Sequence, residues 1–168
     1  MTQKRKRTTR RGDMGLLLRL IDQGFDHQAW HGPTLAGALR GVTWRQALWR
    51  PHQARHNVWE LTLHTAYWKY AVRRRLVGGP QGAFPRAGSN WPELPKSPGE
   101  RAWKADVALL KSEHRTLRET IAALPAAVLG KRGGRGRWTN AEMIHGVAMH
   151  DLYHAGQVQL LLRLRAGV

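Results

Sequence analysis

Two histidines late in the chain, His150 and His154, are four residues apart. In an α-helix this spacing places both imidazoles on one face, roughly 6 Å apart along the axis, which is close enough for them to share a metal ion. Imidazole nitrogen suits divalent zinc and nickel. The pair therefore predicts part of a site for one divalent metal ion.

Two other histidine pairs have the same spacing, and neither is expected inside a helix. His27 and His31 run directly into a glycine-proline pair, where a helix would end. His52 and His56 follow a proline and are expected in a connecting turn. A turn would not hold two imidazoles in a fixed geometry, so only the third pair is interpreted as a metal site.

The third pair follows a clear start signal for a helix. Thr139 and Glu142 have the spacing of a capping box, in which the hydroxyl and the carboxylate satisfy opposite backbone donors. From there, apolar residues and the two histidines recur at alternating steps of four and three, which predicts that they share the face packed against other helices. The members of this face are Met143, Val147, His150, His154, Val158 and Leu161.

A third ligand must be a histidine, an aspartate or a glutamate, because the chain contains no cysteine. His64 is the first candidate, since it shares the inward stripe of another expected helix with Leu61 and Trp68. His114 is a weaker candidate because it lies between basic residues, on the side expected to face water. From the stripes alone, three separately hydrogen-bonded core histidines stay an alternative to a metal site.

The expected helices indicate an all-α fold. Four long segments have apolar stripes at helical spacing, and no segment alternates like a strand, which together favour a four-helix bundle with short accessory helices. The segment 78–99 is rich in glycine and proline, and we expect a long crossover or a lid there. Long helices are expected over residues 14–30, 57–77, 98–124 and 139–163, and short ones over 34–39 and 43–48.

The start of the chain is strongly basic. The net charge is +17, and residues 1–11 contain six basic residues and no acidic one. We expect a disordered basic tail at 1–12 and a single domain at 13–168. Such a tail is typical either of nucleic-acid binding through phosphate contacts or of a solubilising segment. The second interpretation is favoured, because aromatic residues do not interleave with the basic ones to form a stacking platform.

Composition argues against several other classes of protein. Without cysteine there is no disulfide, no thiolate metal site and no cysteine nucleophile. No apolar run approaches the length of a membrane helix, and the basic start lacks the apolar core of a secretory signal. We therefore expect a cytoplasmic protein without membrane contact.

Four segments together resemble the DinB-like (DinB/YfiT) superfamily, which shares its name with an unrelated DNA polymerase. The resemblance covers the chain from about Met14 onward and implies a four-helix bundle with a three-histidine site for a divalent metal, and also a homodimer. Matched by motif, the implied ligands are His64, His150 and His154. The segments are AWHGPTL at 29–35, NVWELTLHTAYWKYAVRRRL at 57–76, NWPELP at 90–95 and HDLYHAGQVQLLLR at 150–163.

Some branches of this superfamily are similar to thiol-dependent enzymes, namely maleylpyruvate isomerases and S-transferases. An ion held by three neutral imidazoles keeps its charge uncompensated and a coordination position open. We therefore expect a metal-dependent hydrolase, or an S-transferase or isomerase that uses a low-molecular-weight thiol, acting on a small molecule. The alternatives are a metal-stabilised nucleic-acid-binding protein that uses its basic surface, and a bundle whose metal is purely structural.

Four further residues are candidates for the surroundings of the metal. Glu60 lies one turn before His64, but its capping-box spacing explains it more simply than a role as general base. Asp151 is rotated about 100° from His150, as expected for a residue of the helix surface or one that orients a ligand. Gln157 would orient a ligand or tie helices together. His31 would approach the pocket from the first turn between helices.

Overall fold

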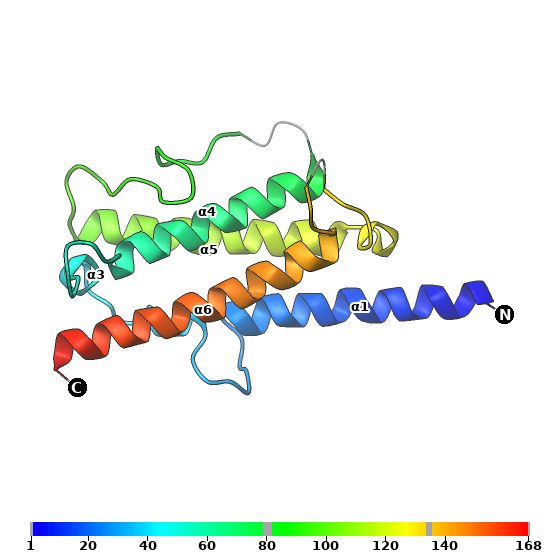
Figure 1. The fold of residues 1–168 in the computed structure, drawn as a ribbon, viewed down its shortest axis with the longest axis horizontal. Coiled ribbons are helices and arrows are strands. Elements are labelled where there is room, and N and C mark those ends of the chain that lie inside the picture. The colour runs from blue at the N-terminus through cyan, green and yellow to red at the C-terminus, as the bar shows by residue number, and fades with distance from the viewer. Residues whose placement is uncertain (1, 79–81, 134–135, 168) are drawn as a thin grey trace.

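Four long helices form the body of the protein in a computed structural model (Figure 1). The structure describes residues 2–78, 82–133 and 136–167, with side chains from residue 13 onward. No strand occurs among these residues, and the expected four-helix bundle with short accessory helices is confirmed. The elements are α1 (Thr2–Phe25), α2 (Leu35–Ala38), α3 (Trp44–Leu48), α4 (Val58–Val77), α5 (Glu100–Ala123), the 3₁₀ helix η1 (Ala126–Val128) and α6 (Asn140–Ala166).

Capping boxes fix the starts of three helices. In each box a Thr or Asn side chain accepts from a backbone N–H, and the residue three positions later binds the cap in return. The two boxes that define α4 and α6 set where the helical turns begin, and thereby which face carries the histidines. The boxes join Thr43 to Gln46, Asn57 to Glu60 and Thr139 to Glu142.

Helix α1 differs from the expected range at both ends. It begins at Thr2, ahead of the expected start near residue 14, and ends at Phe25 rather than near Trp30. The helix ends at its last core residue: Phe25 is buried, whereas Trp30 is fully exposed and adds nothing to the apolar stripe. The division into a disordered tail at 1–12 and a domain at 13–168 stays a prediction.

The expected crossover connects α4 to α5 and passes over α4 (Figure 1). Tyr70 of α4 donates a hydrogen bond to the carbonyl oxygen of Gly82 at 2.6 Å, and Trp68 donates to the side-chain oxygen of Asn90 at 2.8 Å. These contacts hold the segment against the helix that carries His64. Residues 79–81 of the crossover, and residues 134–135 of the basic loop before α6, lie outside the described residues.

Two apolar clusters fill the bundle, and buried polar side chains lie between them. On α6 the histidine pair lies in the gap between the two clusters. One cluster includes Met143, Ile144, Val147 and Ala148, and the other includes Ala155 and Val158. The same arrangement places Lys69 on α4 and His114 on α5 between the clusters. We call the buried polar residues here the polar layer: His64, Thr65, Lys69, His114, Asp151 and His154.

Helix α1 approaches α6 closely next to this layer. A Cβ atom at Gly24 would lie only 2.9 Å from the carbonyl oxygen of Ala148, so a larger residue would push the helices apart. Because Ala148 is two residues before His150, this contact also fixes the position of the histidine pair. Among the described residues, no helix combines the length and the apolar character needed to cross a membrane.

Candidate metal centre

The three histidines singled out from the sequence converge from two helices. Nε2 of His150 lies 3.0 Å from Nε2 of His64 and 3.0 Å from Nε2 of His154. His64 and His154 are buried and His150 is partly buried. The group could hold a metal ion, since each residue offers one ring nitrogen to a common point.

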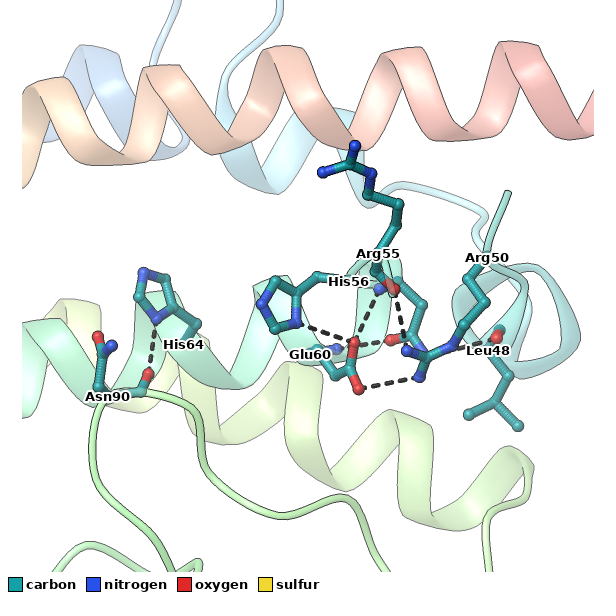
Figure 2. Close-up of polar contacts among 8 residues, drawn as sticks. Leu48, Arg50, Arg55, His56, Glu60, His64 and Asn90 are labelled. Carbon is teal, nitrogen blue, oxygen red and sulfur yellow. Dashed lines mark hydrogen bonds and ion pairs between the residues drawn. The ribbon is translucent and has the colours of Figure 1, made fainter. Parts of the chain in front are cut away.

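Hydrogen bonds at the outer nitrogens determine the tautomers of two of these rings. Nδ1 of His64 lies 2.6 Å from the carbonyl oxygen of Asn90 (Figure 2), and Nδ1 of His154 lies 2.6 Å from Oε1 of Gln157. Both partners are acceptors, so each Nδ1 carries the proton and donates it. Each Nε2 therefore presents a lone pair to the centre, as in metal-binding histidines whose other nitrogen is held by a carbonyl group.

This set of lone pairs fits a cation better than it fits a hydrogen-bonded cluster. A proton on Nε2 of His150 could satisfy either His64 or His154, but not both. Zinc bonds of about 2.0–2.1 Å in tetrahedral geometry would place two ligand nitrogens about 3.3 Å apart. The two pairs that include His150 have a spacing of 3.0 Å, and all three nitrogens lie within 4.8 Å of one another. Gln157, expected to orient a ligand or to tie helices together, orients His154.

Burial keeps all three imidazoles in the neutral form that binds metals. It lowers the pKa of His64 from 6.5 to about 4, assisted by the nearby His154 and His56 and opposed by the hydrogen bond to Asn90. It lowers the pKa of His150 to about 3, again with help from the neighbouring histidines and from Lys69. Burial also lowers the pKa of His154, although the hydrogen bond that His154 donates to Gln157 opposes this shift. Near neutral pH, protons therefore do not compete for the ring nitrogens.

The crossover contributes two residues that sequence reasoning had not singled out. Asn90 has a φ of 63°, a left-handed conformation that asparagine tolerates better than most residues, and its carbonyl points at His64. Trp91 stacks on His64 with ring centroids 3.9 Å apart, and also on His56 at 3.5 Å. The segment thus covers the site, as expected of a lid. The sequence signal for the conformation of Asn90 was an asparagine before Trp-Pro in a glycine-rich connection, because asparagine is favoured in turns.

Asp151 forms a buried ion pair with Lys69, and both side chains are completely inaccessible. Burial raises the pKa of Asp151 to about 6, and the adjacent ammonium group opposes this shift. The expectation of a helix-surface position for Asp151 is therefore wrong. Its partner lies on α4, in the polar layer, and none of the contacts of the described residues joins the carboxylate to an imidazole. A single lysine among the apolar residues of α4 was the only sequence signal for this pair.

Glu60 closes the capping box of α4 and lies in a network of its own. Its carboxylate accepts from the backbone N–H of Asn57 at 2.9 Å, and it pairs with Arg50 at 2.9 Å and with His56 at 3.2 Å (Figure 2). Hydrogen bonds and the charge of Arg50 lower the pKa of Glu60, although burial opposes them. Glu60 therefore stabilises the start of α4, and its described contacts do not include His64, His150 or His154.

Two other histidines lie apart from the three. His31 is exposed in the loop after α1, and it lines neither the cavity beside the three histidines nor the larger cavity near the end of α1. His114 is buried, so its expected position on the water-facing side of α5 is wrong. Its ring stacks on Phe25 with centroids 3.8 Å apart, because α5 is rotated so that Arg118 instead reaches the surface and pairs with Asp22.

A cavity of about 600 Å³ opens beside the three histidines. His64 and His150 form part of its wall, and most of the remaining wall is aromatic or apolar. A cavity of this size accommodates a small molecule. The other lining residues are Trp68, Val72, Trp138, Glu142, Met143, His145, Gly146 and Val147.

Comparison with known families agrees with this geometry. The model of the DinB superfamily matches residues 28–158, a segment that contains all three histidines and most of the bundle. The comparison with curated proteins gave no match, and neither did the comparison with solved structures. Because the family match covers well over half of the sequence, the chain belongs to the DinB superfamily.

Proposed function

We propose that the protein is a divalent-metal-dependent enzyme that acts on a small molecule, as a hydrolase or as a thiol-dependent S-transferase or isomerase. The observation that carries the proposal is the convergence of three neutral imidazoles beside a cavity of about 600 Å³. Structural zinc sites are normally closed by four protein ligands, whereas three ligands next to open space are typical of catalytic ones. Zinc and nickel are the metals proposed, since imidazole suits both.

The charge balance around the histidines favours a ligand that brings negative charge. The carboxylates of Glu60, Asp151 and Glu142 all have other partners in the structure. A divalent ion held by neutral imidazoles lowers the pKa of a bound water towards about 7 and likewise favours the thiolate form of a thiol. A small molecule with a thiol or an anionic group is therefore the expected ligand.

The walls of the cavity determine what else the ligand contains. Trp68 and Trp138 provide aromatic surfaces, and Val147 provides an apolar one. Trp68 is held by its hydrogen bond to Asn90, the residue that also orients His64. The side chain that touches the ligand and the side chain that would bind the metal are thus positioned by the same part of the crossover. A compact ligand with an apolar body fits this arrangement.

The test compares two glycine substitutions on α6 in cobalt-substituted protein. Gly146 lines the cavity, whereas Gly156 does not, and a Cβ atom added at either position meets nothing within 4 Å. We expect Gly146→Phe to fill the cavity and Gly156→Phe to leave it open, with cobalt retained in both. Low-molecular-weight thiols are then added, and the visible spectrum is followed for a thiolate-to-cobalt charge-transfer band.

The thiol-dependent function is supported if the unmodified protein and Gly156→Phe both show the band and Gly146→Phe binds the thiol at least tenfold more weakly. Absence of the band in all three proteins, with water exchange at the metal still measurable, supports hydrolysis. If neither thiol nor water reaches the ion in the unmodified protein, the metal is structural and the proposal is wrong. If Gly146→Phe changes nothing, the cavity is not the route to the site.

A further inference from the structure

A second and larger cavity lies on another side of the bundle. It has a volume of about 910 Å³ and is formed by the end of α1, the region from α2 to the start of α3, and one face of α5. None of its lining residues belongs to the cavity beside the three histidines. The two cavities are therefore separate potential binding sites.

The floor of the second cavity is mostly apolar and includes the polar side chain of His114. Phe25, Trp103, Val107 and Leu110 contribute apolar or aromatic surface. His114 lies among them, 4% exposed, and no hydrogen bond to its buried Nδ1 is found in the described structure. Because no such bond fixes the tautomer, its ring can donate to a ligand or accept from one.

The rim of the cavity is positively charged. Lys111 and Arg115 are exposed side chains one helical turn apart on α5, and the exposed Arg40, just after α2, lines the same cavity. None of the three has an acidic partner among the described contacts. Like charges at this spacing on a helix repel each other, so the pair on α5 would be stabilised by an anion between its members.

The other charged side chains of the cavity have partners in the structure, and its acidic residue Asp26 contacts His27 at 2.7 Å. Arg118 makes a two-point contact with Asp22, at 2.5 and 2.9 Å, and Lys104 pairs with Glu100 at 3.1 Å. The uncompensated positive charge is thus confined to the part of the rim that adjoins the apolar floor. This is an amphipathic site, with cations at one edge and aromatic and aliphatic carbon below.

We propose that this cavity is a second ligand site, which takes a small organic anion. The apolar body of the ligand lies against Phe25, Val107 and Leu110, and its carboxylate or phosphate group lies between Lys111 and Arg115. His114 provides the single polar contact at the floor. The site is independent of the histidines on α4 and α6 and of the activity proposed for them.

The test measures binding of 1-naphthyl phosphate and 1-naphthoate by titration calorimetry at low salt, with uncharged 1-naphthol as comparison. The charge variant is Lys111→Gln/Arg115→Gln, and its control, Arg163→Gln/Arg165→Gln, removes the same charge from exposed positions at the end of α6. We expect Lys111→Gln/Arg115→Gln to weaken the binding of both anions at least about tenfold, because the loss of each charged hydrogen bond has an effect of this order. We expect the control to change little.

A steric variant tests the cavity without changing charge. Ala108 is exposed and lines the cavity, whereas Ala105 is exposed on the same helix and does not. We expect Ala108→Trp to abolish binding of the two anions and Ala105→Trp to leave it unchanged. His64→Ala should also leave it unchanged, because that residue belongs to the other cavity.

Several outcomes would overturn the proposal. These are no binding of either anion at millimolar concentration, equal binding of 1-naphthol, or affinities that Ala108→Trp leaves intact. Loss of binding in His64→Ala would assign the anions to the metal centre instead. A single-stranded oligonucleotide is the last probe: if it binds and depends on Lys111 and Arg115 while the small anions do not bind, the face is a nucleic-acid surface and the small-ligand proposal is wrong.

Discussion

The carbonyl oxygen of Asn90 lies 2.6 Å from Nδ1 of His64, so the crossover determines how this imidazole is oriented. Asn90 adopts a φ of 63° to make the contact, and its side chain simultaneously accepts from Trp68. A residue in a left-handed conformation persists only where its surroundings hold it. The crossover is therefore part of the candidate metal centre as well as a connection between α4 and α5.

Substitution of Asn90 tests this relationship. Asn90→Gly keeps the carbonyl and the left-handed backbone, so metal affinity should change little. Asn90→Val places a β-branched residue at a positive φ, which should displace the carbonyl and lower the affinity about 10- to 100-fold. Affinity is measured by competition with a coloured chelator. Equal affinities for the two variants would mean that the Asn90 carbonyl does not orient His64.

A matched pair of glutamines tests the equivalent contact at His154. Gln157 accepts from Nδ1 of His154 at 2.6 Å, whereas no contact between Gln159 and the three histidines is found in the described structure. Gln157→Leu should lower metal affinity about 10- to 100-fold, and Gln159→Leu should not. If both leave the affinity of the unmodified protein intact, the amide of Gln157 has no role in holding the imidazole.

Local patterns were sufficient to predict most of the fold. The capping boxes at Asn57 and Thr139 and the apolar stripes act within a few turns of helix, so their consequences can be derived from spacing alone. The same holds for His150 and His154, which share one helix. The apolar stripe of its helix made His64 a candidate, and the resemblance to the superfamily implied it as the third ligand. The structure brings the three rings together.

What could not be predicted depends on contacts between distant segments. The pairing of Lys69 with Asp151 is set by how α4 and α6 are rotated against each other, and the burial of His114 by the rotation of α5. The role of Asn90 depends on the path of the crossover, which glycine and proline leave undetermined. In each case local spacing was compatible with a surface or connecting position. The packing of the whole bundle determines whether the residue is buried and what it contacts.

The buried pair of Lys69 and Asp151 should be strongly coupled in stability. Asp151→Ala leaves the ammonium group uncompensated in the core and is expected to lower the free energy of unfolding by about 3–5 kcal/mol. The double variant Lys69→Met/Asp151→Leu removes both charges and should lower the free energy of unfolding much less. Urea unfolding of the metal-free proteins measures both values. If the double variant loses as much unfolding free energy as Asp151→Ala, the two charges do not interact as the structure places them.

The lowered pKa values of the histidines predict a loss of stability in mild acid. In the unfolded chain both His64 and His150 take up a proton near pH 6.5. In the folded protein the lowered pKa delays this to about pH 4 for His64 and about pH 3 for His150. The contribution of these histidines to the free energy of unfolding is therefore fully present above about pH 6.5, and it is lost as the pH falls towards the folded-state pKa values. Each histidine contributes up to about 1.4 kcal/mol per pH unit in that range.

Urea unfolding of metal-free protein at pH 7, 6 and 5 measures this dependence. His150→Gln should reduce the slope of unfolding free energy against pH, and His52→Gln, at an exposed position, should leave it as in the unmodified protein. A stability that does not change between pH 7 and 5, or an identical slope in His150→Gln, would contradict the burial of neutral imidazoles.

The central claim is that His64 of α4 and the pair on α6 together bind one divalent ion. Its most direct test is the metal content of purified protein by elemental analysis, for the unmodified chain, His64→Ala and the control His52→Ala. The account predicts about one divalent ion per chain in the unmodified protein and in His52→Ala, and nearly none in His64→Ala, because two ligands on one helix hold the ion weakly without the third. Full occupancy in His64→Ala, or no divalent ion in the unmodified protein after supplementation with zinc or nickel, would contradict it.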